Sequence, residues 1–157
     1  MKTLFYSFAL MMILALVSAP ALAQDKPADN MQIVREKIRA DKKLVVAETM
    51  GMTESEAKAF WPVYEAYQED LAKINERTIK LIDDYAQNYG AMSNQAAKKL
   101  MDEFMAIEAE HLRIRQSYLP RFRQVLPEIK VLRYYQLENK IEAVVSYELA
   151  ASIPLVR

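Results

Sequence analysis

The sequence predicts an all-α protein built on an elongated antiparallel helical hairpin, with one further helix before it and another after it, four helices in all. Composition supports this prediction, because the 157-residue chain has only two glycines and is rich in residues that favour helices. Two apolar stripes give the stronger support. Their members recur at alternating spacings of three and four residues, which is typical of helices that pack along one narrow face.

The first stripe lies within residues 60–89 and continues for more than three heptads. Charged and amide side chains separate its members, so a helix with this pattern needs a partner that carries a matching stripe. We expect a short helical turn from Glu54 to Phe60, and then a kink or a restart at Pro62. The stripe consists of Phe60, Tyr64, Tyr67, Leu71, Ile74, Thr78, Leu81 and Tyr85.

The second stripe follows a short connection that contains Gly90 and Ser93. Gly90 suits a left-handed C-terminal cap, and Ser93 can cap the next helix. Because the connection is short, the two helices are predicted to run antiparallel. Pro120 is expected to bend or end the return helix near Tyr118. The stripe consists of Leu100, Phe104, Ile107, His111, Ile114 and Tyr118.

A helix is also predicted on each side of the hairpin. The first begins at Asn30 and ends before Gly51, and the capping-box pattern of Thr53 and Glu56 marks the start of the next helix. The last helix is predicted from Glu128 to Ala151. The stripe of the first helix is Val34, Ile38, Asp41 and Val45, beside Ile33 and Leu44, and that of the last is Tyr134, Leu137, Ile141 and Val144.

The N-terminal residues are predicted to be a secretory signal peptide, residues 1–23. Lys2 is followed by an apolar run of about 14 residues, which is shorter than the ~20 residues of a membrane-spanning helix. Small residues precede the expected cleavage site after Ala23. Residues 24–29 are expected to be a disordered leader and residues 30–157 a single helical domain. We therefore expect a secreted protein of a bacterial periplasm, with no integral membrane segment after cleavage.

Charge is balanced overall and uneven along the chain. The 21 basic and 21 acidic side chains do not favour nucleic acid as a partner. Acidic residues dominate residues 48–84 and basic residues dominate residues 111–133. These segments could face each other, or the basic one could bind an acidic client or sensor domain. The candidate partner-binding residues are Arg113, Arg115, Tyr118, Arg121, Phe122, Arg123, Lys130, Arg133, Tyr134 and Tyr135.

Tyrosines and methionines allow two interpretations. Tyr64 and Tyr67 are expected to be core residues with their hydroxyls at its rim. Met92, Met101 and Met105 could be core as well, or they could bind partly unfolded chains on a concave surface, because methionine adapts to many shapes.

No catalytic constellation is predicted, so we expect a protein that is not an enzyme and that uses no cofactor. The chain has no cysteine, no Gly-x-Ser-x-Gly motif and no glycine-rich phosphate loop. Glu108 and His111 have the i, i+3 spacing of helical di-metal sites, but such a site needs a second Glu-x-x-His motif and His111 is the only histidine. They are candidates for an adventitious or interfacial metal site only. Otherwise His111 is expected near the hairpin seam.

The stretch Met52–Tyr64 resembles the Spy/CpxP-type periplasmic stress proteins, especially their sigma-factor-sensor-like branch. Those proteins carry a Leu-Thr-x-x-Gln signature twice, each copy opening a helix. Here the copies read Met52-Thr53-x-x-Glu56 and Leu126-Pro127-x-x-Lys130, so both depart from the strict signature. The resemblance covers about residues 50–142. It implies a long bent α-hairpin, often in a cradle-shaped dimer, with ATP-independent chaperone or sensor-binding roles. Zinc is not implied, because the histidine-rich segments of one branch are absent.

These observations together predict a protein that acts by protein–protein contact. Its partners would be misfolded clients or an envelope-stress sensor, and it could form a homodimer. Two alternatives remain open at this stage: a metal-binding or metal-sensing helical protein, and a structural component of the envelope.

Overall fold

The computed structural model describes residues 40–156, and this part of the chain is helical with no strand. The prediction of an all-α fold with a long hairpin and flanking helices is confirmed. The described helices belong to one compact unit, Ala40–Arg157. In chain order they are a helical segment at residues 40–50, α2 (Glu54–Asn88), the 3₁₀ helix η1 (Tyr89–Ala91), α3 (Asn94–Val125) and α4 (Glu128–Ser152).

Several predictions lie outside the described residues. These are the signal peptide at residues 1–23, the leader at residues 24–29 and the start of the first helix and of the domain at Asn30. Among the described residues, none of the helices combines the length and the apolar character that a bilayer span requires.

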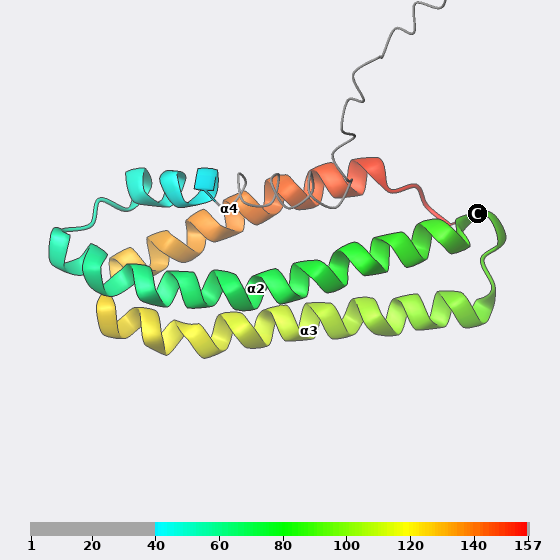
Figure 1. Cartoon of the computed structure of the whole chain (residues 1–157), viewed down its shortest axis with the longest axis horizontal. Coiled ribbons are helices and arrows are strands. Elements are labelled where there is room, and N and C mark those ends of the chain that lie inside the picture. Colours follow the sequence, from blue (N-terminus) through cyan, green and yellow to red (C-terminus); the bar gives the residue numbers. More distant parts are fainter. Residues whose placement is uncertain (1–39, 157) are drawn as a thin grey trace, which may run out of the picture. The chain divides into compact units, whose positions relative to one another are not determined.

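The hairpin consists of α2 and α3, which run side by side in opposite directions (Figure 1). Their 35 and 32 residues correspond to rods ~50 Å long at 1.5 Å per residue. Only Leu126 and Pro127 separate α3 from α4, so α4 turns back along the hairpin. The residues after α4 return to α2, where the Tyr85 hydroxyl donates a hydrogen bond of 2.6 Å to the carbonyl of Pro154.

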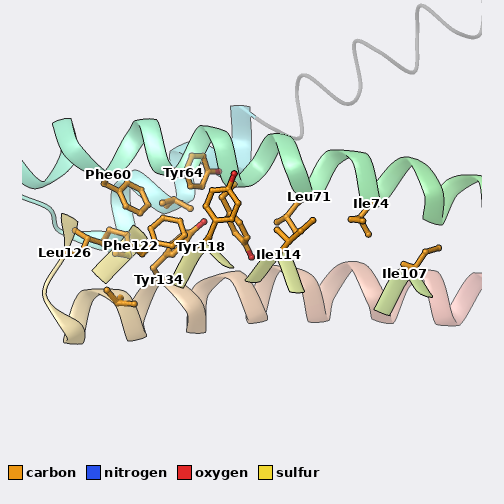
Figure 2. Packing of buried hydrophobic residues seen from close by; sticks show 14 residues of the cluster. Phe60, Tyr64, Leu71, Ile74, Ile107, Ile114, Tyr118, Phe122, Leu126 and Tyr134 are labelled. Atoms are coloured by element: carbon orange, nitrogen blue, oxygen red, sulfur yellow. The ribbon is translucent and has the colours of Figure 1, made fainter. Parts of the chain in front are cut away.

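The core follows the seam of the hairpin (Figure 2). It is richest in aromatic rings where segment 40–50, α2, α3 and α4 meet. Five members of the first stripe are buried, as predicted, and its last three are partly buried. The cluster consists of Val46, Met50, Phe60, Tyr64, Tyr67, Leu71, Ile74, Ile107, Ile114, Tyr118, Phe122, Leu126, Val131 and Tyr134.

Two helix starts follow the predicted side-chain chemistry. The Glu56 amide donates to the Thr53 hydroxyl at 3.3 Å, and the Thr53 amide donates to the Glu56 carboxylate at 2.7 Å. This reciprocal pair is the predicted capping box. At α3 the Ala96 amide donates to the Ser93 hydroxyl at 3.1 Å, which confirms Ser93 as an N-cap.

The two prolines do not interrupt their helices, and the restart predicted at Pro62 and the helix end predicted near Tyr118 are wrong. α2 continues through Pro62, and α3 continues through Pro120 as far as Val125. Both prolines are exposed. A proline inside a helix costs ~3 kcal/mol, but in each helix large aromatic side chains on both sides of the proline are buried. Their burial requires the same helical face to continue across it, and tertiary packing therefore prevails.

The glycine prediction at the hairpin turn is also wrong. Gly90 lies in η1 without a positive φ, and α2 leads directly into that 3₁₀ turn. Among the described residues, Gly51 alone has a positive φ, at 54°. The left-handed residue therefore terminates the helical segment 40–50 and does not terminate α2.

The buried face of residues 40–50 differs from the predicted one, whereas that of α4 agrees with the prediction as far as Ile141. In residues 40–50 the buried side chains are Val46 and Met50, whereas Val45 is exposed. In α4 the predicted stripe members Tyr134, Leu137 and Ile141 are buried or partly buried, and the last one, Val144, is exposed. The prediction for residues 40–50 is wrong because the buried face of this segment includes Lys42, which pairs with Glu138 of α4, and an apolar count does not recognise such a residue.

The two glycines provide a matched test of backbone conformation. A Cβ atom would meet nothing within 4 Å at either position, so the φ angle decides the effect. We expect Gly51→Ala to lower the free energy of unfolding by ~1 kcal/mol, because a left-handed φ strains any residue with a Cβ. We expect Gly90→Ala to be neutral or stabilising by up to ~1 kcal/mol, because it restricts the unfolded chain. Urea unfolding of both variants measures this, and equal effects would contradict the assignment.

Candidate partner-binding surface

Three of the candidate partner-binding residues belong to the core. Phe122 and Tyr134 are fully buried, and their ring centroids lie 4.7 Å apart. Tyr118 is also buried, and its hydroxyl donates a hydrogen bond of 2.7 Å to the carboxylate of Asp70. A partner on the surface of the folded domain does not reach these rings, so their role in the structure is to hold α2, α3 and α4 together.

Several of the candidate basic side chains are paired within the domain. Arg115 lies 3.1 Å from Glu142 of α4 and 5.8 Å from the centroid of the Tyr135 ring. Tyr135 in turn donates a hydrogen bond of 2.9 Å to the backbone carbonyl of Arg115. Burial raises the pKa of Tyr135 to about 12, so its hydroxyl stays protonated and remains a donor. These contacts hold residues 135–142 of α4 against α3.

Other candidate residues pair with near neighbours. Arg113 binds Glu110 one turn earlier, with an N–O distance of 2.5 Å, and Arg123 lies 2.9 Å from Glu128 across the connection between α3 and α4. Such exposed pairs contribute little to stability. They do, however, neutralise the basic segment locally, which weakens it as a site for an acidic partner.

Lys130 is the central contact of the α2–α4 junction. Its ammonium lies 2.5 Å from the Glu56 carboxylate and donates to the backbone carbonyl of Gly51 at 2.9 Å. Glu56 also accepts from the Thr53 amide. The hydrogen bond from Lys130, followed by that from Thr53, holds the pKa of Glu56 below its ordinary value of 4.5. One lysine thus connects α4, the capping box of α2 and the end of segment 40–50.

Two basic residues of the set remain at the surface. Arg121 is exposed and its guanidinium lies 4.6 Å from the centroid of the Tyr118 ring, and Arg133 is exposed on α4. One ion pair, Lys130–Glu56, joins the basic segment 111–133 to the acidic segment 48–84, whereas Arg113, Arg115 and Arg123 pair with carboxylates outside that acidic segment.

The candidate metal residues are not brought together with other ligands. His111 Nδ1 lies 3.4 Å from the Glu142 carboxylate, whereas Glu108 is exposed. Within residues 40–156 there is no group of three or more histidine, aspartate or glutamate side chains placed to hold a metal ion. A histidine and one carboxylate would leave most coordination positions of a transition metal to water.

An exposed apolar surface lies on α3, and sequence reasoning found only part of it. We define the α3 surface as Met101, Phe104, Met105 and Leu112, whose exposed fractions lie between 44% and 56%. Spacings of three, four and seven residues place them on neighbouring faces of the helix. Phe104 was predicted in the seam and is not buried there. For Met92, Met101 and Met105 the sequence left both a core position and an adaptable binding role open, and Met101 and Met105 are exposed, so they are not core residues.

A second exposed apolar surface lies on the far half of α4. We define the α4 surface as Val144, Val145, Tyr147 and Leu149, with exposed fractions between 36% and 73%. All residues from 142 to 152 are exposed, so no described helix covers this half of α4. Apolar residues at adjacent positions such as Val144 and Val145 point to different sides of a helix, a pattern that indicates burial on more than one side. The sequence contains this pattern, but the prediction of a single apolar stripe for this helix did not include it.

An open hollow between α2 and α3 near the hairpin turn is lined mainly by charged and uncharged polar side chains. Arg77 lies 3.0 Å from Glu103, and Lys80 lies 2.7 Å from Asp84. Four of the five charged side chains that line the hollow are therefore paired with one another.

No protein-family model, curated protein or solved structure matches this chain. The resemblance of residues 52–64 to the Spy/CpxP-type proteins therefore stays a prediction.

Because the candidate residues differ in burial, we expect their mutations to lower the free energy of unfolding by different amounts. We expect Phe122→Ala to lower the free energy of unfolding by ~3–5 kcal/mol, because it leaves a cavity among packed rings. We expect Arg133→Ala, at an exposed position, to change it by less than ~0.5 kcal/mol. Chemical denaturation followed by circular dichroism compares the two. A small effect of Phe122→Ala would show that the junction is not the core of the domain.

The Glu56–Lys130 pair predicts a loss of stability in acid. The folded-state pKa of Glu56 is lowered, so between that value and about 4.5 the unfolded chain binds more protons and acid favours unfolding. The stabilisation is complete above the unfolded pKa and disappears as the pH falls through the folded one. Glu56→Gln keeps a capping-box side chain without the charge. We expect wild type to exceed this variant in stability at neutral pH and to lose that advantage in acid. A difference independent of pH in urea unfolding would contradict this.

Proposed function

We propose that this chain is an exported protein that acts by binding other proteins, chiefly as an ATP-independent chaperone for partly unfolded chains. The observation that carries the proposal is the pair of exposed apolar surfaces on α3 and α4. Monomeric proteins rarely expose large contiguous apolar patches, and those that do often use them to bind partners. Export rests on the predicted signal peptide at residues 1–23, with the bacterial periplasm as the proposed location.

The side chains on these surfaces favour an adaptable binder. Met101 and Met105 are unbranched and polarizable, so they can adjust to apolar segments of different shape. Phe104 and Tyr147 add aromatic area, which contributes most to contact energy. Such a mixture suits many weakly related clients better than one rigid partner.

The charge distribution supports apolar contact as the main driving force. Most basic residues of the 111–133 segment already pair with carboxylates of the domain, as Arg115 does with Glu142. Their contribution to capture of an acidic partner is therefore reduced. An adaptor for an envelope-stress sensor, the second role that the resemblance to Spy/CpxP-type proteins implies, would use the same surfaces with one defined partner.

Replacement of the α3 surface tests the proposal directly. In Met101→Gln/Met105→Gln/Leu112→Gln, each apolar side chain becomes a polar one that still favours helix. We expect wild type in several-fold molar excess to suppress light scattering by a chemically denatured client. The triple variant should need roughly tenfold more protein or worse, because each apolar contact contributes ~1.5–3 kcal/mol when buried.

The matched control removes exposed apolar side chains elsewhere. Ile129 and Leu132 on the first half of α4 are 76% and 60% exposed and lie outside both surfaces, so Ile129→Gln/Leu132→Gln should leave suppression unchanged. If wild type does not suppress aggregation, the chaperone role is wrong. If both variants lose activity equally, the α3 surface is not the site.

A further inference from the structure

Residues 40–50 are attached to the domain in a different way from the other helices. Of the buried cluster, this segment supplies only Val46 and Met50, both fully buried. Leu44 and Val45 are exposed. Gly51, with a φ of 54°, and two further non-helical residues separate the segment from α2. Within the described residues, the segment therefore contributes few buried side chains and is joined to α2 by a short non-helical turn.

The same face of the segment carries one basic residue. The Lys42 ammonium lies 2.8 Å from the Glu138 carboxylate of α4 and 2.9 Å from the side-chain oxygen of Gln68 of α2. Lys42, Val46 and Met50 follow at intervals of four residues, which places them on one side of a helix. Within residues 40–50, a basic residue followed by two apolar residues forms the centre of the contact face. Lys43 adds a contact beside it, 2.6 Å from Glu65 and 5.0 Å from the centroid of the Trp61 ring.

The surface beneath this face is held together without the segment. We call it the seat and define it as Phe60, Tyr64, Gln68, Tyr134 and Glu138. The ring centroid of Tyr134 lies 5.2 Å from that of Phe60 and 6.1 Å from that of Tyr64. Gln68 Nε2 lies 3.3 Å from Glu138. These contacts join α2 to α4 directly, so the seat is preorganised for a helix.

We infer that the seat is a helix-binding site, filled in the structure by residues 40–50 and open to exchange with a helix of another protein. The incoming helix would carry a lysine or arginine followed by apolar residues four and eight positions later. This inference uses different residues from the α3 and α4 surfaces, and it does not depend on chaperone activity.

Glu138 gives the seat its selectivity. Its side chain is 6% exposed, so a carboxylate left there without a cation would be a buried, unpaired charge, which is strongly unfavourable. A helix that lacks the basic residue would displace Lys42 and leave Glu138 without a cation. Lys43 makes the contrasting contact, because it pairs with the exposed Glu65 at 2.6 Å, where water replaces a missing partner.

The cis segment also sets the threshold for exchange. A tethered ligand with a short linker acts at an effective concentration on the order of millimolar. A foreign helix must outcompete it, so weak helices are excluded and only a well-matched partner or a local rise in concentration opens the site. Residues 40–50 would in this way keep the seat closed in the free protein.

A labelled peptide tests the exchange on the full chain. The peptide has the sequence of residues 40–52 with a fluorescent label, and its anisotropy is followed on titration with wild type and with Val46→Ser/Met50→Ser, whose own segment no longer fills the seat. We expect the peptide to bind the double variant at least about tenfold more tightly than wild type, because the tethered competitor is weakened. Equal affinities, or no saturable binding to the double variant, would overturn the inference.

Selectivity is tested by neutral replacements of equal size. Adding Glu138→Gln to the double variant should weaken peptide binding by about tenfold or more, whereas adding Glu65→Gln should change it by less than about threefold. A peptide with Lys42→Met should bind poorly to the double variant and should be insensitive to Glu138→Gln. Equal effects of the two glutamine replacements would overturn the role of Glu138.

Hydrogen exchange of the wild-type chain gives a result that does not depend on variant folding. The amides of residues 44–50 should exchange at least about 100-fold faster than those of residues 64–71 in α2, because the segment opens by itself. Exchange of both regions at one rate would show that the segment leaves only on global unfolding. If sedimentation shows a wild-type dimer that Glu138→Gln dissociates, the occupant is a second copy and the proposed foreign partner is wrong.

Discussion

The contact between Phe122 and Tyr134 is the interaction on which the rest of the domain depends. Their ring centroids lie 4.7 Å apart, and Phe60 and Tyr67 of α2 pack against the same pair. Aromatic rings in tilted and edge-to-face arrangements bury large apolar area and add a directional term. Since α4 is joined to α3 by only Leu126 and Pro127, this stack fixes where α4 lies against the hairpin, and so where the seat forms.

Polar groups within the stack make it specific. Gln68 lies 3.4 Å from the Tyr134 hydroxyl, and Lys42 and Glu138 complete the network. Burial raises the pKa of Tyr134, Tyr67 and Tyr64 well above the usual range, so their hydroxyls remain neutral. In the described residues no buried side-chain nitrogen or oxygen lacks a partner. A chain without cysteine has no disulfide to hold its helices together. Here the packed rings and the hydrogen-bonded polar groups between them hold the helices together.

Several charged and apolar side chains lie in other environments than the sequence predicts. Arg115 and Lys130, for which the sequence left both charge pairing and partner binding open, bind carboxylates across helices, whereas Phe104 and Val144, expected to be core, are exposed. Val144 is exposed because no described helix covers the far half of α4. The surfaces that support a binding function are therefore the ones that the packing of α2, α3 and α4 leaves uncovered.

The sequence by itself determined the helical class, the hairpin seam, the capping box at Thr53 and the N-cap at Ser93, because these depend on local periodicity and on side chains near in sequence. It did not determine the continuity of α2 and α3 through Pro62 and Pro120, or which face of residues 40–50 is buried. Those outcomes depend on contacts between residues far apart in sequence, such as Lys42 with Glu138 and Phe60 with Tyr134. Only tertiary packing brings such groups together, and their joint burial outweighs the local preference of a proline or an apolar stripe.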